Sequence, residues 1–306
     1  MKTNKLNLAM SLLAVSFFMF SCSNDDDNSN QLPQTANLTL NLNGLEDLGA
    51  GFAYEGWVMV DGTPISTGTF TVNANGALSA TSFPVEVEIL NSATKFILTV
   101  EPSPDPDPAP SDQKLIAGDF VGNSAAVSTS VAPAVGDFSN AAGTFFLRTP
   151  TDEPMGSGNN GNDQYGVWFG LPGMPPSPNL TLPELPQGWT YEGWVVGDSG
   201  PLSTGTFNSF DQMDDNAGAS TSFSGTEQLG PPLPGEDFFN NAPAGETFPL
   251  DVRGRNVVIS IEPVPDNSPA PFVLKPLAAI AGNGTAPDFH NFNQNLSSFP
   301  TGTVTR

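Results

Sequence analysis

The chain has 306 residues, and its 32 Asp and Glu against 9 Lys and Arg give a formal net charge of −23. Nine cations are too few to build a phosphate-binding surface against this negative charge. We therefore expect no nucleic-acid partner and no electrostatic binding to anionic lipid head groups. Hydrophobic residues make up 38% of the chain and include 22 Phe and 4 Trp. This is enough apolar material for a folded core.

Cysteine and histidine each occur once, as Cys22 and His290. No disulfide can form within the chain, and metal centres built from several thiolates or imidazoles are excluded. A Ser-His-Asp site would have to use His290, and no Gly-x-Ser-x-Gly nucleophile elbow accompanies it. We therefore expect no catalytic residue and no cofactor, and we interpret His290 as a surface or strand-edge side chain.

Residues 1–21 are predicted to be a signal peptide. Lys2 and Lys5 form a short positive segment, and residues 6–20 are mostly apolar but too short to span a bilayer comfortably. Cys22 follows directly, and the segment resembles a bacterial lipoprotein signal, in which the Cys becomes the N-terminus and carries the lipid. We expect lipidation at Cys22. An ordinary secretory signal with an incidental Cys is the alternative.

An acidic segment follows the cysteine and consists of Ser23, Asn24, Asp25, Asp26 and Asp27. It resembles the export signal that sends lipoproteins of the Bacteroidetes to the cell surface. Residues 22–35 are also expected to be a solvated, disordered tether. The prediction is an outer-membrane lipoprotein that is exposed on the cell surface, and a periplasm-facing anchor is the alternative. No later segment is apolar over 18 residues, so the prediction is an anchored protein rather than a membrane-spanning one.

The strongest pattern is an internal repeat. Three blocks recur: YEGWV at 54–58 and 191–195, STGTF at 66–70 and 203–207, and FILTVEP at 96–102 against VVISIEP at 257–263. The first two blocks are offset by 137 residues and the third by 161, so the second copy contains an insertion of 24 residues. A period of this length is the size of a domain.

The predicted fold is all-β, with two tandem β-sandwich domains at residues 36–172 and 173–306. The Pro-rich segment 171–178 is expected to be a stiff linker between them. Apolar residues alternate with polar ones inside short runs bounded by Gly, Pro and Asn, which is typical of sandwich strands. Further strands are expected at 54–60, 67–72, 85–90, 114–120, 143–148 and 165–169, and residues 299–306 are expected to close the second domain.

The order of the blocks resembles a known family. A Tyr-x-x-Trp strand is followed by a Gly- and Pro-containing stretch, an apolar strand ending in Glu-Pro, a Pro-rich turn and a strand that ends on Gly. Residues 37–120 and 179–282 are similar in this order to the extracytoplasmic C-terminal domain of anti-sigma-K-type anti-sigma factors. The resemblance implies a sensing or binding module, but it implies no catalytic residues and names no ligand.

The chain also departs from that family. Anti-sigma factors of this type carry a cytoplasmic sigma-binding segment and one transmembrane helix, and the sequence shows neither. We therefore expect the resemblance to reflect domain ancestry rather than binding of a sigma factor.

The repeat also marks the candidate site residues. Glu55 with Glu192 and Glu101 with Glu262 are candidate paired acids for glycoside hydrolysis, although they can equally point outward or end a strand. The repeated residues, expected to be mainly structural, are Tyr54, Glu55, Trp57, Glu101, Pro102, Tyr191, Glu192, Trp194, Glu262 and Pro263. Trp168, Phe169 and Trp189 are less fixed by the repeat, which leaves open a small aromatic platform for a ligand.

No metal site is predicted, although oxygen-rich loops offer weak calcium candidates. The main ones are Asp211, Asp214 and Asp215, with Asp105, Asp107 and Asp163 as similar cases. None of these loops follows the Asp-x-Asp-x-Asp-Gly pattern, so solvated loops are the simpler interpretation.

The favoured hypothesis is a non-catalytic binding or sensing module, anchored by lipid, whose partner is an extracellular glycan or an envelope protein. A surface enzyme that processes glycan or peptide with paired Glu residues is one alternative. An accessory partner of a transmembrane anti-sigma signalling system is another. Exposed Trp beside an accessible carboxylate pair would favour the enzyme, and buried Trp with isolated Glu would favour the module.

Overall fold

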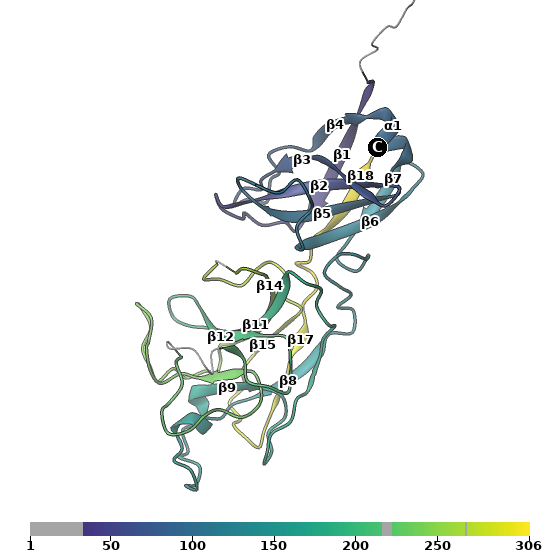
Figure 1. The fold of residues 1–306 in the computed structure, drawn as a ribbon. Helices are drawn as coiled ribbons and strands as arrows, with labels where there is room; N and C mark the ends of the chain where they lie inside the picture. Colours follow the sequence, from purple (N-terminus) through teal and green to yellow (C-terminus); the bar gives the residue numbers. More distant parts are fainter. Residues whose placement is uncertain (1–32, 216–221, 267) are drawn as a thin grey trace, which may run out of the picture. The chain divides into compact units, whose positions relative to one another are not determined.

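The computed structural model describes residues 33–215, 222–266 and 268–306, and within them strands dominate (Figure 1). The expected all-β class is confirmed. The described part contains one α-helix, α1 (Val87–Ser92), and two short 3-10 turns, η1 (Pro150–Asp152) and η2 (Asp163–Tyr165). None of its helices is long and apolar enough to cross a bilayer. The predicted signal peptide, Cys22 and the acidic segment lie outside the described residues.

The largest sheet has eight strands in the order β3-β2-β5-β6-β7-β18-β1-β4. Their bounds are β1 (Thr35–Asn43), β2 (Phe52–Val60), β3 (Thr63–Phe70), β4 (Ser82–Glu86), β5 (Lys95–Pro102), β6 (Lys114–Val121), β7 (Ser124–Val127) and β18 (Thr301–Thr305). In β1 the buried residues Leu38, Leu40 and Leu42 alternate with exposed neighbours. This period of two places one apolar face of the strand against the core.

The last strand does not lie where the sequence predicts. It was expected to close the second domain, but β18 pairs with β1 and β7, so that expectation is wrong. Figure 1 shows the yellow β18 between the purple β1 and the teal β7. The segment TGTVT carries one buried apolar residue, Val304, and such a short pattern fits many sheets equally well.

The remaining strands form two five-stranded sheets. One has the order β10-β8-β9-β13 with β16 also on β8, and its strands are β8 (Ala142–Phe146), β9 (Gly166–Phe169), β10 (Leu180–Thr181), β13 (Gly235–Asp237) and β16 (His290–Asn291). The other has the order β12-β11-β14-β15-β17, with β11 (Trp189–Val196), β12 (Pro201–Phe207), β14 (Asn256–Pro263), β15 (Leu277–Ile280) and β17 (Asn293–Gln294).

Strand pairing crosses the expected domain boundary at residue 172 in both directions. β8 and β9 precede it and pair with β10, β13 and β16, which follow it, whereas β18 returns to the eight-stranded sheet. The chain from β8 to β17 is therefore inserted between two neighbouring strands, β7 and β18. The expected linker is a tight loop, because Leu171 and Ser177 exchange two backbone hydrogen bonds.

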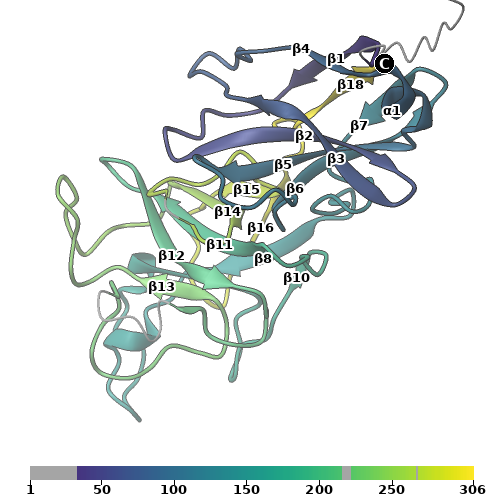
Figure 2. The ribbon, with the colours of Figure 1, turned by 45° about the horizontal axis from the view of Figure 1, so that its top comes forward.

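The repeat is visible as the same arrangement of four strands. β3-β2-β5-β6 in the first copy corresponds to β12-β11-β14-β15 in the second, where Figure 2 shows β11 beside β12. The register also repeats: Trp57 lies opposite Ser66, and Trp194 lies opposite Ser203. In both copies the strand register shifts between the glycine and the tryptophan, at Gly56/Trp57 and at Gly193/Trp194. The equivalent residues therefore occupy equivalent places in their sheets.

One predicted strand is partly helical. Residues 85–90 alternate as a strand would, but strand β4 ends at Glu86 and α1 follows. Glu86 is paired with Thr35, the first residue of β1, so the chain beyond it has no neighbouring strand. A helical turn satisfies the backbone groups locally while Leu90 remains buried.

Candidate functional site

Glu192 on β11 and Glu262 on β14 lie side by side in one sheet. Glu192 is opposite Ser260, and Glu262 is opposite Thr190, which makes the two glutamates diagonal neighbours on one face. Neither points into solvent, since Glu192 is 5% exposed and Glu262 is 0% exposed. Ser203 donates a hydrogen bond to Glu192 Oε1, whereas Oε2 is buried and has no hydrogen-bond partner.

Glu262 is held by a chain of donors. Trp194 Nε1 donates to Ser260 Oγ at 2.7 Å, and Ser260 donates to Glu262 Oε1. The backbone N–H of Phe272 donates to both oxygens of the same carboxylate, at 2.9 and 3.1 Å. Glu262 is therefore fixed in position by the fold.

Asp266 completes a group of three carboxylates. The turn after β14 brings it back toward the sheet, and its Oδ1 accepts a hydrogen bond from Ser268 N at 2.8 Å. One oxygen from each of Glu192, Glu262 and Asp266 lies within 4.8 Å of the other two. In the described part of the chain, this is the one group of three potential metal ligands that close together.

The first repeat places the same residue types in the same order. Ser66 donates to Glu55, as Ser203 does to Glu192, and Ser111 N donates to Glu101, as Phe272 N does to Glu262. Asp105 corresponds to Asp266 and likewise accepts a backbone hydrogen bond two residues on. Glu55 is buried like Glu192, at 7% exposed. The carboxylates of Glu55, Glu101 and Asp105 nevertheless do not form a group as close as that of the second copy.

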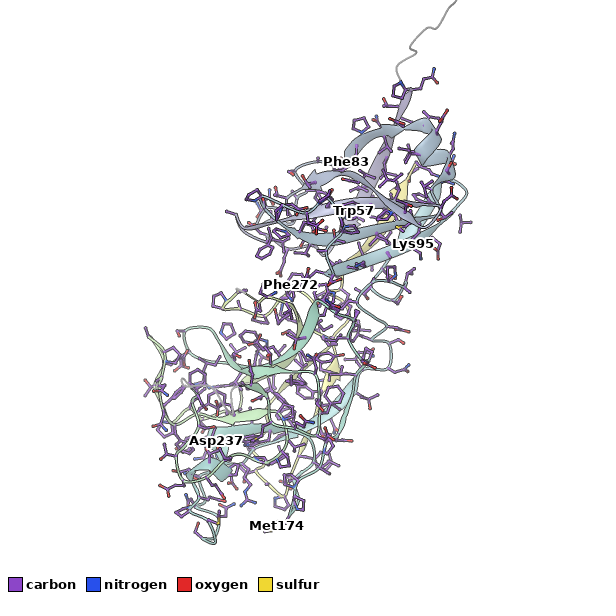
Figure 3. All side chains as sticks on the ribbon, viewed as in Figure 1. Trp57, Phe83, Lys95, Met174, Asp237 and Phe272 are labelled. Atoms are coloured by element: carbon purple, nitrogen blue, oxygen red, sulfur yellow. The ribbon has the colours of Figure 1, made fainter. Side chains whose placement is uncertain are left out.

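A cavity of about 510 Å³ opens beside Glu262 and Asp266. Its other acidic residues, Glu46 and Asp47, come from the loop between β1 and β2. Figure 3 labels Phe272, which also lines the cavity. The remaining lining residues are Leu48, Gly49, Gly51, Phe52, Val100, Pro263, Pro265 and Ser268. Glu192 is not a lining residue; it lies next to the two carboxylates that are.

Burial dominates the electrostatics of this cavity. Desolvation raises the pKa of Glu46 to about 7, with Lys275 opposing the shift, and raises the pKa of Glu262 to about 7 against its hydrogen bonds from Ser260 and Phe272. It also raises the pKa of Glu192, and the nearby charge of Glu262 adds to that shift. Burial lowers the pKa of Lys275. Each of these shifts disfavours the charged form of the group, which is the effect of removing it from water.

The repeated aromatic residues lie inside the sheets. The rings of Tyr54 and Phe70 stack at 5.5 Å, and those of Tyr191 and Phe207 stack at 5.9 Å. Trp57 Nε1 donates to Thr99 Oγ1 at 2.9 Å, which matches the contact of Trp194 in the second copy. Pro102 and Pro263 end their strands, β5 and β14.

Trp168, Phe169 and Trp189, which the sequence left open as an aromatic platform for a ligand, are buried. All four tryptophans of the chain are at most 3% exposed, and Phe169 is fully buried. Trp168 Nε1 donates to Asp237 Oδ1 at 3.0 Å, while Trp189 packs against Phe272. No tryptophan therefore offers a face on which a sugar ring can stack.

His290 takes part in the fold. It pairs with Phe145 across β16 and β8, and its ring lies 5.1 Å from the Phe145 ring. Its Nε2 lies 2.9 Å from the carbonyl oxygen of Gly284, which places a backbone group rather than a nucleophile beside it.

The loop carboxylates proposed as weak calcium candidates are engaged separately. Asp211 accepts from Ser209 Oγ, Asp214 from Gly235 N and Asp215 from Thr206 N, at distances of 2.6 to 2.8 Å. Asp163 accepts from Asn159 Nδ2 at 2.7 Å. None of them belongs to the close carboxylate group of the described residues.

Sequence reasoning missed Asp266, Glu46, Asp47 and Lys275. Asp266 could have been found from the repeat, because EPSPD at 101–105 recurs as EPVPD at 262–266 with the same offset as the strand before it. Lys114 and Lys275 also correspond, and each donates to a backbone carbonyl three residues earlier. Glu46 and Asp47 lie in a loop without any repeated pattern, so only the fold brings them to the cavity.

A comparison with known protein families matches part of the chain. Residues 31–114 match the family described as "Anti-sigma-K factor rskA, C-terminal". The chain therefore carries an anti-sigma-factor-like domain of the extracytoplasmic kind, and the match extends from the region of β1 to the start of β6. No curated protein and no solved structure matches the chain significantly.

Proposed function

We propose that this protein is a non-catalytic binding module of the bacterial envelope, held at the membrane by lipid on Cys22. Its acidic cavity receives a positively charged group of an envelope partner. The observation that carries this proposal is the convergence of Glu46, Asp47, Glu262 and Asp266 on one cavity. Among the described residues, none of these four has an ion-pair partner within 4.0 Å, and the charge of Lys275 acts on Glu46 and Glu262 from farther away. The charge of the cavity favours a basic segment of a protein over a neutral glycan.

A cationic probe tests the binding role. The chain carrying Cys22→Ala, released without lipid, is titrated with pentalysine at two salt concentrations. We expect binding that weakens with salt and is reduced several-fold by Asp47→Asn, while Asp107→Asn leaves it unchanged. Asp107 is exposed and lies outside the cavity, so this control changes net charge equally. Equal loss in both variants would refute the cavity as the site.

Protease shaving of intact cells tests the anchor and its direction. We expect the wild-type protein to be membrane-bound and cleaved by added protease, and Cys22→Ala to leave the membrane fraction. A membrane-bound but protected protein would place the module in the periplasm, where a partner in envelope signalling becomes the better hypothesis. Membrane retention of Cys22→Ala would overturn the lipid anchor.

A paired-carboxylate hydrolase is the second candidate, and the closeness of Glu192 and Glu262 favours it. Three features weigh against it: both side chains are buried, Glu262 already accepts several hydrogen bonds, and no exposed Trp is present to hold a sugar. Hydrolysis of a polysaccharide or peptide by the parent protein, lost in Glu262→Gln, would establish the enzyme instead.

A further inference from the structure

We infer that Glu192, Glu262 and Asp266 form a calcium-binding site at the side of the acidic cavity. This inference rests on the proposed binding role of the cavity, and it names one cation that the cavity holds.

The spacing of the three carboxylates suits a shared ion. Oxygen ligands at about 2.4 Å from a Ca²⁺ ion lie at most about 4.8 Å from one another. One oxygen of each of the three side chains meets this limit. Ca²⁺ takes six to eight oxygen ligands, so the three carboxylates leave coordination positions that face the cavity for water or a partner's oxygen atoms.

A second observation points to a missing ligand. Glu192 is a buried residue, 5% exposed, and its Oε2 has no hydrogen-bond partner. A buried carboxylate oxygen without a donor is costly, because it has lost its water without replacement. The donors present, from Ser203, Ser260 and the backbone, orient the three carboxylates but supply no full positive charge.

The chemistry of the ligands selects the ion. All three side chains offer hard oxygen atoms, which suit Ca²⁺ or Mg²⁺ rather than the softer metals that prefer sulfur or imidazole. Mg²⁺ requires near-ideal octahedral geometry at about 2.1 Å and usually keeps several waters with one or two carboxylates, whereas Ca²⁺ accepts several carboxylates in a flexible arrangement, so three protein carboxylates favour Ca²⁺. Two of the ligands come from adjacent strands and the third from a turn, so the site is preorganised.

The first repeat provides a matched control. Glu55 occupies the place of Glu192 and accepts the equivalent serine hydrogen bond, but its group of carboxylates is not comparably close. Glu55→Gln therefore removes the same chemical group from the same type of strand without removing a proposed ligand.

Thermal unfolding tests the site. The lipid-free chain carrying Cys22→Ala is stripped with chelator, dialysed and heated with no metal, with CaCl2 or with MgCl2 at 5 mM. We expect Ca²⁺ to raise Tm by about 3–5 °C, as for a site that is mostly filled, and Mg²⁺ to raise it less. Glu192→Gln should lose the Ca²⁺-dependent rise, and without metal its Tm should be equal to or above that of the parent. Glu55→Gln should keep the full response.

Asp266→Asn supplies a second route if Glu192→Gln does not fold, because Asp266 is half-buried in a turn and tolerates change more readily. Titration calorimetry with CaCl2 should then show at least about tenfold weaker binding than in the parent. No response of the parent to Ca²⁺, or equal responses in all variants, would overturn the site. If pentalysine still binds while Ca²⁺ does not, this inference fails and the proposed function stands.

Discussion

Trp194 and Ser260 are joined by a buried hydrogen bond of 2.7 Å from the indole Nε1 to the serine Oγ. The serine donates in turn to Glu262, so one side chain connects the aromatic core of the sheet to the acidic group. In the first repeat Thr99 takes the place of Ser260 and accepts from Trp57.

Ser260→Ala should destabilise the protein. It leaves the Trp194 Nε1 buried without an acceptor, which costs about 1–3 kcal/mol. Ser260→Thr should cost less than about 1 kcal/mol, since threonine keeps the hydroxyl and repeat one accommodates it at the equivalent position. Urea unfolding of the two variants measures the difference. Equal stability of the alanine and threonine variants would show that the hydroxyl does not matter.

The repeat made much of this arrangement predictable. The shared blocks around Trp57 and Trp194 sit in matching registers, and the Glu-Pro strand ends place Glu101 and Glu262 equivalently. A repeat implies equivalent strand positions, so it places Glu55 and Glu101 in the first copy as it places Glu192 and Glu262 in the second. The local sequence pattern does not show that Glu192, Glu262 and Asp266 lie closer together than their counterparts in the first copy, nor that Glu46 lines the same cavity. Both features depend on contacts between distant segments.

The path of the chain between sheets was not predictable either. The period of two identifies strands but not their neighbours, and a five-residue strand with one apolar side chain has no distinctive partner. The Pro-rich segment was expected to extend as a linker. It folds back on itself because Leu171 and Ser177 pair, which composition alone does not show.

The position of β18 gives a prediction about the C-terminus. Val304 is fully buried between Leu40 on β1 and Ala125 on β7. Val304→Ala should cost about 1.5–3 kcal/mol, from the lost apolar burial and the space left behind. Thr303→Ala, at an exposed neighbouring position of the same strand, should change stability by less than about 0.5 kcal/mol.

Removal of residues 301–306 should have a larger effect than Val304→Ala. It opens the eight-stranded sheet between β1 and β7 and removes Arg306, which donates to the carbonyl oxygens of Leu90 and Gly122. An unchanged Tm after this deletion would contradict the observed strand order.

Gly118 on β6 is predicted to be intolerant of any side chain. A Cβ atom there would lie 2.2 Å from the carbonyl oxygen of Ala126 and 2.9 Å from a Val127 methyl group. Because the first contact is with backbone, Gly118→Ala should cost about 3 kcal/mol or more. Gly158→Ala is the matched control, since nothing lies within 4 Å of its Cβ position. Equal chemical denaturation midpoints for the two variants would refute the close strand approach.

Asp237 on β13 predicts how stability depends on pH. Its side chain, labelled in Figure 3, is fully buried and accepts hydrogen bonds from Trp168 Nε1 and from both the backbone and the hydroxyl of Thr151. Burial raises the pKa of Asp237 to about 8, against these hydrogen bonds, while an unfolded Asp titrates near 4. Between these values the unfolded state releases a proton that the folded state keeps.

The stabilising contribution of protonated Asp237 is therefore complete below about pH 4 and is lost as pH rises toward 8. Glu236, whose pKa is also raised by burial, contributes in the same direction. We expect the urea midpoint to fall between pH 5 and pH 8, and Asp237→Asn to reduce that fall, because asparagine does not titrate. Asp107→Asn, at an exposed position, should retain the parent slope. A midpoint that rises with pH, or an Asp237→Asn variant with the full parental slope, would show that Asp237 is ionised in the folded protein and held by its donors.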